Sequence, residues 1–173
     1  LYDSLAVITL GYPENMSADY IQERLSTFDG VKRRYTVKTV GNNIYVDDYA
    51  HHPTAIRYVI EATRSRYPHK KIVAIFQPDR FSRGLRFAKE FAEAMDLADY
   101  PFFVHFPENA KKEPGIDIDI YDIAKYNPRA QVIHEDEAAV KLLSQYDNVV
   151  YLFMSSKDIY KLEDQVIAYK QSQ

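Results

Sequence analysis

The sequence predicts an α/β protein with a mostly parallel sheet and helices on both faces. From residue 44 onward, short runs of apolar residues alternate with longer amphipathic stretches. This is the pattern of buried parallel strands connected by helices. The first apolar run, residues 44–48, is followed by a short loop and then Pro53, a residue favoured at the first position of a helix. At 173 residues, 46% of them hydrophobic, the chain can bury a substantial core.

Two helices are expected before this alternation begins. An apolar stretch over residues 4–11 ends at a glycine, and a serine-capped amphipathic stretch covers residues 17–28. The pair Asp-Gly at 29–30 is a turn signal, and the sequence changes in character after it. We therefore predict a helical segment over 1–29 and the main domain over 30–173.

The remaining elements are predicted in chain order. Two β-rich runs between residues 33 and 48 are separated by Gly41-Asn42-Asn43, which predicts a hairpin. Further helices are expected at 53–67, 83–98, 120–126, 136–146 and 157–169, and further strands at 71–77, 100–106, 131–134 and 148–154. The charged, proline-bounded stretch 107–115 is expected to be an exposed loop. Right-handed crossovers then bring the carboxyl ends of the parallel strands to one edge of the sheet.

The composition excludes several classes of partner and site. The net charge of -3 gives no electrostatic reason to expect nucleic acid as a partner. No apolar run approaches the roughly 20 residues of a membrane span, so no membrane partner is expected either. The absence of cysteine excludes disulfides and thiolate metal sites, and it is consistent with a cytoplasmic protein.

The first candidate site residues follow the strand at 44–48. Asp47 and Asp48 should point to opposite sides of the sheet, so only one is expected to reach the crevice at the strand ends. A carboxylate there binds ribose hydroxyls or a cation, or else it caps a helix or pairs within the hairpin. Neither His51 nor His52 has a metal-ligand partner nearby, so no metal site is expected. One imidazole is expected to bind substrate, and the other to pack or to be solvated.

Arginines supply the second set of candidates. They are found in Lys32-Arg33-Arg34, before the hairpin, and as Arg80, Arg83 and Arg86, after the strand at 71–77. The guanidinium fork binds two oxygens at once and suits phosphate or carboxylate. Simple solvation is the better interpretation for Lys32 and Arg86. The chain has no G-x-x-x-x-G-K-[ST], G-x-G-x-x-G or G-x-S-x-G motif, so it offers ligand-contacting groups without a complete catalytic set.

Three strings resemble, in order and spacing, the carboxy-terminal domain of the Mur ligases. They are GVKRRY (30–35), VDDYAHHPTAI (46–56) and FQPDRFSR (76–83), and they are most similar to the members that join L-alanine to UDP-N-acetylmuramate. The resemblance implies a Rossmann-like third domain over 30–173. It also implies that residues 1–29 are the last helices of the central ATP-binding domain, and that this domain and an amino-terminal domain precede them in a longer protein.

The resemblance further implies an ATP-dependent ligase of peptidoglycan precursor synthesis in the cytoplasm. In such enzymes an amino acid attacks an acyl phosphate formed from UDP-N-acetylmuramate and ATP. The central domain would bind most of the ATP and Mg²⁺, so this chain alone is expected to be inactive and to hold no catalytic residue of its own.

Individual positions match family motifs. Arg34 matches an arginine near the ATP phosphates, while Asp48 and His51 match the D-Y-A-H motif near the nucleotide. These three are therefore the expected cofactor-binding residues. The expected substrate-binding residues are Tyr49, His52, Arg80 and Arg83, the two arginines matching a loop near the amino-acid carboxylate.

Two strings depart from the alanine ligases. Asp79 stands where they have His, and Ser155-Ser156-Lys157-Asp158 stands where they have G-A-G-D. An acid would repel a carboxylate, and loss of two glycines removes backbone freedom. A changed substrate, including a peptide in place of alanine, is one expectation. The alternative is a noncatalytic nucleotide-binding or interaction module that has kept the fold.

Overall fold

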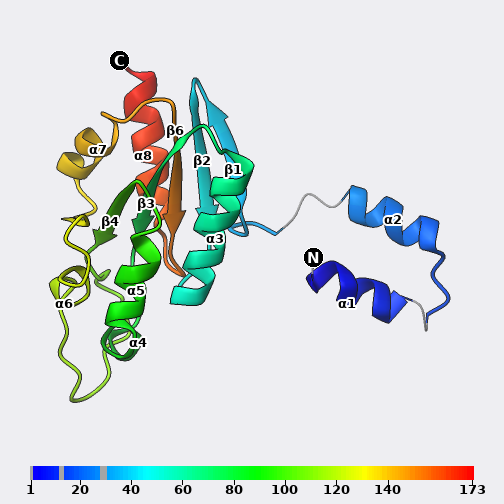
Figure 1. The fold of residues 1–173 in the computed structure, drawn as a ribbon, viewed down its shortest axis with the longest axis horizontal. Coiled ribbons are helices and arrows are strands. Elements are labelled where there is room, and N and C mark those ends of the chain that lie inside the picture. Colours follow the sequence, from blue (N-terminus) through cyan, green and yellow to red (C-terminus); the bar gives the residue numbers. More distant parts are fainter. Residues whose placement is uncertain (1, 12–13, 28–30) are drawn as a thin grey trace. The chain divides into compact units, whose positions relative to one another are not determined.

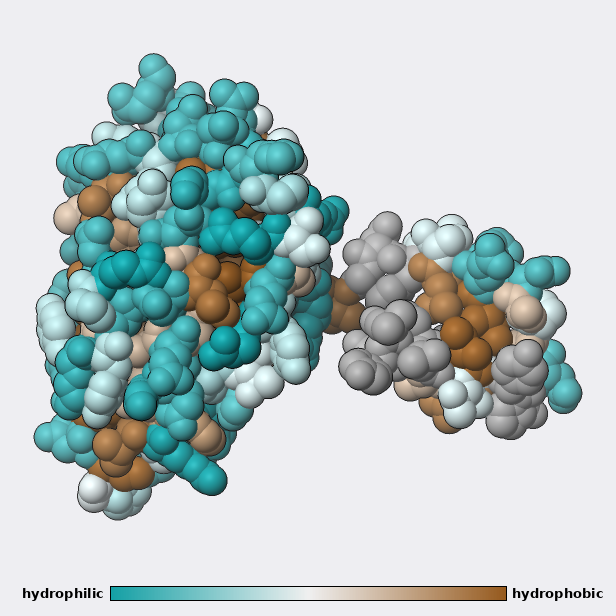
Figure 2. Space-filling view, viewed as in Figure 1, coloured by the Kyte–Doolittle hydropathy of each residue, from teal (hydrophilic) through white to brown (hydrophobic). Residues whose placement is uncertain are grey.

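The computed structural model describes residues 2–11, 14–27 and 31–173. Contacts divide it into two compact units, Leu1–Val31 and Lys32–Gln173. The first unit consists of α1 (Tyr2–Gly11) and α2 (Ala18–Ser26). The Ser17 hydroxyl caps α2 by accepting the N–H of Tyr20 at 3.2 Å, which confirms the predicted start. Hydrophobic side chains gather between the two helices (Figure 2) and line an apolar groove.

The second unit is a six-stranded sheet with helices on both faces (Figure 1). Its elements are β1 (Thr36–Val40), β2 (Asn43–Asp48), α3 (Pro53–Arg66), β3 (Lys71–Phe76), α4 (Phe81–Arg86), α5 (Ala88–Met95), β4 (Tyr100–Val104), α6 (Tyr121–Ala124), β5 (Gln131–Ile133), α7 (Glu137–Leu143), β6 (Val149–Met154) and α8 (Tyr160–Gln171). The strand order is β1-β2-β6-β3-β4-β5. Only the hairpin β1–β2 is antiparallel among these neighbours. The predicted α/β fold with a mostly parallel sheet is confirmed.

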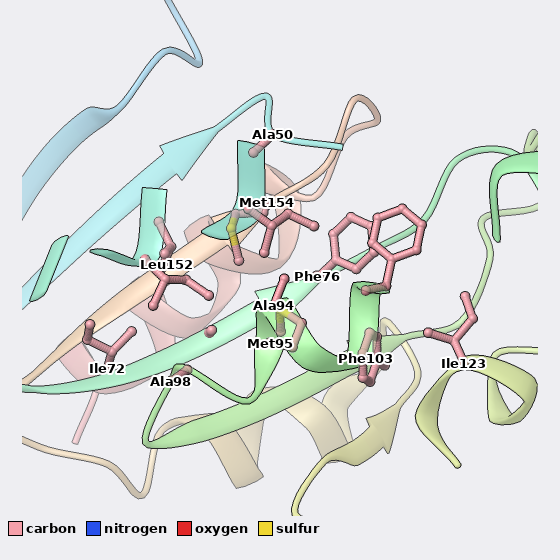
Figure 3. Packing of buried hydrophobic residues seen from close by; sticks show 14 of the residues in the cluster. Ala50, Ile72, Phe76, Ala94, Met95, Ala98, Phe103, Ile123, Leu152 and Met154 are labelled. Carbon is pink, nitrogen blue, oxygen red and sulfur yellow. The ribbon is translucent and has the colours of Figure 1, made fainter. Parts of the chain in front are cut away.

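Alternating side chains of the central strands feed two separate cores. Along β3, Ile72 and Phe76 face α3 and α5, whereas Val73 and Ile75 face α7 and α8. In the first core, Phe76 stacks on Phe91 of α5 with ring centroids 4.9 Å apart, and neighbouring side chains close around it (Figure 3). Strands buried on both faces explain why their sequences read as continuous apolar runs.

One predicted helix is two. Residues 83–98 were expected to form a single helix, but the chain breaks at Phe87, where φ is -120° and ψ is 24°, between α4 and α5. The Phe87 ring packs edge-on against the His52 ring, with centroids 4.9 Å apart. The helical spacing of Phe87 and Phe91 continues through the break, so periodicity alone does not reveal it. The last helix, expected from residue 157, begins at Tyr160.

The strand order creates a crevice at the carboxyl edge of the sheet. From β3 the chain moves outward to β4 and β5, and it then returns to place β6 between β2 and β3. The helix after β3 packs on one face and the helix after β6 on the other. Segments that leave adjacent strands in opposite directions leave room between them, and ligands of open α/β sheets bind at such switch points.

Among the described residues, no helix is both long enough and apolar enough to cross a membrane.

Candidate functional site

Asp48, the last residue of β2, holds the backbone on either side of the β1–β2 hairpin by hydrogen bonds. It is only 8% exposed, and its two oxygens accept the N–H groups of Tyr35 at 2.8 Å and Ala50 at 2.7 Å. Burial raises the pKa of the Asp48 carboxyl, although these two N–H donors oppose the shift. Asp47 turns to the other face, where its carboxylate lies 3.4 Å from Arg33 Nε. The two carboxylates therefore diverge, as the alternation along a strand predicts.

Four of the predicted site residues are linked by direct contacts around Tyr49. The exposed Arg34 guanidinium lies over the Tyr49 ring at 5.2 Å, and the His51 ring meets that ring edge-on at 5.0 Å. His51 Nδ1 lies 2.8 Å from the carbonyl oxygen of Tyr49. The carbonyl oxygen of His51 in turn accepts Arg83 Nη1 at 3.4 Å. We call Arg34, Tyr49, His51 and Arg83 the Tyr49 cluster.

Arg83 is already paired within the protein. Its Nη1 lies 3.0 Å from Asp79 Oδ1, one helical turn earlier, and the two side chains are 22% and 14% exposed. An ion pair this shielded leaves little net charge for a ligand. Asp79 therefore neutralises the charge of Arg83, and it would also repel the carboxylate of a ligand.

The other two predicted residues make different contacts. His52 is the N-cap of α3, and its Nδ1 accepts the N–H of Thr54 at 3.3 Å. Arg80 is exposed at the start of α4 and forms no ion pair with any described residue. Their roles toward substrate stay predictions. His52 caps α3, whereas the guanidinium of Arg80 is exposed and forms no ion pair with the described residues.

Arg33 was a candidate only as part of Lys32-Arg33-Arg34, and the family motifs singled out Arg34, yet Arg33 makes more contacts than Arg34. Its Nη2 donates to the carbonyl oxygen of Ser155 at 2.7 Å and also to that of Lys157. Its guanidinium lies 5.5 Å from the centroids of both the Tyr49 and Tyr160 rings.

The backbone of Arg33 is also unusual, with φ at +60°, a left-handed value uncommon outside glycine. The surrounding contacts hold it there, and together they tie the segment before β1 to the loop after β6. Nothing in the string Lys-Arg-Arg distinguishes this arginine from its neighbour.

The loop after β6 compensates for its missing glycines. Ser155 is fully buried, and its hydroxyl accepts the N–H of Lys157 at 3.0 Å. Its own N–H donates to the carbonyl oxygen of Asp48 at 3.2 Å. A serine side chain thus closes the turn, and the loop is held against β2.

A pocket of about 440 Å³ lies at the switch point, on the α8 side of the sheet. We call it the Gln77 pocket; its polar lining includes Gln77, Glu108, Asn109, Glu135, Lys157 and Asp158. Gln77 follows β3 and is 1% exposed; its Nε2 donates to the carbonyl oxygen of His105 at 3.2 Å. No predicted site residue lines this pocket. Its wall comes from the segments that follow four strands and from α8, so no single sequence motif predicts it.

The pocket offers charges of both signs. Asp158 is paired with Lys161 at 3.2 Å, and Lys157 Nζ approaches the carbonyl oxygen of Asn109 at 3.4 Å. Glu108 and Glu135 form no ion pair within the described ranges. A cavity of this volume and polarity suits a small polar or zwitterionic molecule. In the described part of the chain, no three His, Cys, Asp or Glu side chains are grouped to hold a metal ion.

Solved structures share this fold. UDP-N-acetylmuramate–alanine ligase MurC from Thermotoga maritima is 27% identical, with a TM-score of 0.75, over 98% of this chain and 37% of that one. A murein peptide ligase from Psychrobacter arcticus is 21% identical, with a TM-score of 0.71, over 98% of this chain and 36% of that one. A bifunctional folylpolyglutamate synthase/dihydrofolate synthase from Yersinia pestis, complexed with AMPPNP and a Mn ion, is 15% identical, with a TM-score of 0.64, over 96% and 37%.

The chain spans a little over a third of the length of these proteins. The likeness to the last two shows the fold alone. The model of the Mur ligase family's glutamate ligase domain matches residues 32–156, which is most of the second unit. The chain therefore belongs to the Mur ligase family.

Proposed function

We propose that this chain is the carboxy-terminal part of an ATP-dependent ligase of peptidoglycan precursor synthesis that acts in the cytoplasm. The complete protein would join L-alanine, or a related amino acid or peptide, to UDP-N-acetylmuramate. ATP supplies the phosphoryl group that activates the sugar carboxylate as an acyl phosphate. Residues 1–29 would be the last helices of the central domain, which would bind most of the ATP and Mg²⁺.

The observation that carries the proposal is the Tyr49 cluster at the carboxyl edge of the sheet. Arg34 holds an exposed guanidinium there, free of any ion pair with the described residues and oriented by the Tyr49 ring. Such a group fits a phosphate. The Asp48 carboxylate keeps lone pairs beyond the two N–H groups it accepts, so it can still accept a ribose hydroxyl. His51 adds a ring nitrogen beside them.

The incoming amine substrate would bind near Arg80 and the Gln77 pocket. Arg80 offers a free cation for its carboxylate, and the Gln77 pocket offers space and polar groups. The polypeptide around these groups binds and orients the reactants, while the chemical step is completed by the domains that precede this chain.

The proposal is tested in the full-length protein by measuring amino-acid-dependent phosphate release from ATP in the presence of UDP-N-acetylmuramate. Arg34→Ala should lower turnover at least tenfold, about 1.4 kcal/mol in the activation barrier. Lys32→Ala removes an exposed cation two residues away and should leave turnover unchanged. Near-normal rates in Arg34→Ala would refute the role given to Arg34.

A second candidate is a noncatalytic nucleotide-binding or interaction module with the same fold. The Asp79–Arg83 ion pair and the altered loop at Ser155–Asp158 favour it, since both change groups expected at a substrate site. Robust amino-acid-dependent phosphate release by the full-length protein would exclude this candidate. ATP binding without any such release would favour it.

A further inference from the structure

The loop after β3 contains an internal ion pair between Asp79 and Arg83. Arg83 Nη1 is shared between Asp79 Oδ1 at 3.0 Å and the carbonyl oxygen of His51 at 3.4 Å. A guanidinium binds a carboxylate best when two parallel N–H groups are free. At Arg83 one side of the fork is committed within the protein, and the positive charge faces a carboxylate that is mostly shielded from water.

Two further charged side chains lie in and beside this loop, those of Arg80 and Glu113. Arg80 is exposed and free of ion pairs with described residues. A further carboxylate, that of Glu113, accepts the hydroxyl and the N–H of Ser82 at 2.8 and 3.2 Å. These hydrogen bonds lower the pKa of Glu113, and the positive charges of Lys111 and Arg80 add to the shift. The loop therefore presents one free cation instead of the two that its arginines suggest.

Backbone hydrogen bonds join this loop to the segment after β4, which lines the Gln77 pocket. The N–H of Lys111 donates to the carbonyl oxygen of Asp79 at 3.0 Å, and the N–H of Phe81 donates to that of Lys111 at 3.2 Å. Just before Lys111, the chain lines the pocket with Glu108. The charged groups that line the pocket are three carboxylates and two ammonium groups: Glu108, Glu135, Asp158, Lys157 and Lys161. The pocket side therefore also favours positive charge over negative.

From this balance we infer that Asp79 is a specificity residue that selects an amine substrate with a neutral or basic side chain and rejects an acidic one. The inference rests on the proposed function. The single carboxylate of a neutral amino acid pairs with Arg80. A second carboxylate finds Arg83 Nη1 committed and the charge of Asp79 repulsive, which is discrimination by an unfavourable contact. Removing the charge of Asp79 frees Arg83 and relieves the repulsion together.

The test uses Asp79→Asn, which preserves the size of the side chain and removes its charge. In the full-length protein, kcat/KM is measured for L-alanine, L-lysine and L-glutamate through phosphate release. The variant should raise kcat/KM for L-glutamate relative to L-alanine at least tenfold, chiefly through KM. Asp96→Asn is the matched control, because it breaks another Asp–Arg ion pair, Asp96–Arg129 at 2.6 Å, that borders neither the loop nor the pocket. Its ratio should stay at the wild-type value.

A second measurement separates this inference from the proposed function. Binding of the same amino acids to residues 1–173 is followed by NMR titration without ATP. Asp79→Asn should strengthen L-glutamate binding relative to L-alanine, even in a protein that releases no phosphate. Absence of phosphate release from the wild type with every amino acid and peptide tried would count against the ligase alone. An unchanged glutamate-to-alanine ratio in both assays would overturn the role of Asp79.

Discussion

The Tyr49 cluster and the Gln77 pocket lie at the same edge of one sheet, yet their polar groups are used differently. In and around the cluster, the Asp48 carboxylate accepts two backbone N–H groups, and the Arg83 guanidinium is paired with Asp79. In the pocket, Glu108 and Glu135 have no ion-pair partner among the described residues. We therefore expect changes to the internally bonded groups beside the cluster, such as Asp48 and Arg33, to weaken the fold. Changes to the exposed Arg34 or to the pocket should weaken ligand binding with little effect on stability.

The largest expected effect comes from Asp48→Ala. It leaves the N–H groups of Tyr35 and Ala50 without their acceptor, and each buried unsatisfied group costs about 1–3 kcal/mol. We expect the free energy of unfolding, measured with urea, to fall by about 2–5 kcal/mol. Asp48→Asn keeps one acceptor oxygen and should lose less. A loss below about 1 kcal/mol in Asp48→Ala would contradict the structural role of this carboxylate.

Arg33→Ala should have the next largest effect. The variant loses hydrogen bonds to two carbonyl oxygens and an ion pair with Asp47, which predicts a loss of about 2–3 kcal/mol. Arg34→Ala removes only an exposed contact with the Tyr49 ring and should lose less than about 0.5 kcal/mol. The two variants are compared by urea unfolding of the same chain. Equal losses would show that the contacts of Arg33 do not support the strand-end loops.

Glu163 tests whether a buried carboxylate without good hydrogen bonds lowers the stability of the fold, in contrast to Asp48. It is fully buried on α8, and its nearest partner is Lys38 Nζ at 3.2 Å. Burial raises the pKa of Glu163, Lys38 opposes this, and the charge of Asp47 adds to it.

An acid with a raised pKa binds its proton more tightly in the folded chain. Its contribution to stability is therefore lost as the pH rises from the ordinary value of 4.5 through the raised pKa. Glu163→Gln removes this loss, so the unfolding free energy of the variant relative to wild type should increase over that pH range. Urea unfolding at several pH values measures it. A difference that is constant with pH, or that decreases, would contradict the shift.

The smallest effect on stability is expected for Lys157→Ala. The ammonium group makes only a 3.4 Å approach to the carbonyl oxygen of Asn109, so unfolding should change by less than about 0.5 kcal/mol. In the full-length protein, KM for the amine substrate should nevertheless rise several-fold with kcat less affected. A large loss of stability would instead place Lys157 with Asp48 and Arg33, the residues that support the fold.

Much of the fold could be predicted because local signals agreed with the tertiary structure. The turn at Gly41, with φ at +58°, the Ser17 cap and the proline at the start of α3 each have a sequence signature. The break at Phe87 could not be predicted, because apolar spacing continues across it. Packing against His52, which is distant in sequence, accompanies the break.

The site was harder to predict than the fold. The sequence predicted that a strand ends at Asp48 and that Tyr49 and His51 follow it in a loop, and β2 does end there. The choice between Arg33 and Arg34 depends on the carbonyl groups of a loop more than a hundred residues later. The spacing of Asp79 and Arg83, four residues apart, was a visible signal for an ion pair. The Gln77 pocket had no such signal, since its lining residues are scattered over the segments after four strands and over α8.

The anchoring of Arg33 also prepares the residue that follows it. Arg33 Nη2 is fixed to the carbonyl oxygens of Ser155 and Lys157 in the loop after β6. Arg34 therefore starts from a backbone that is already ordered, and a ligand that pairs with its guanidinium has to order only the side chain. Preorganisation of this kind lowers the entropic cost of binding.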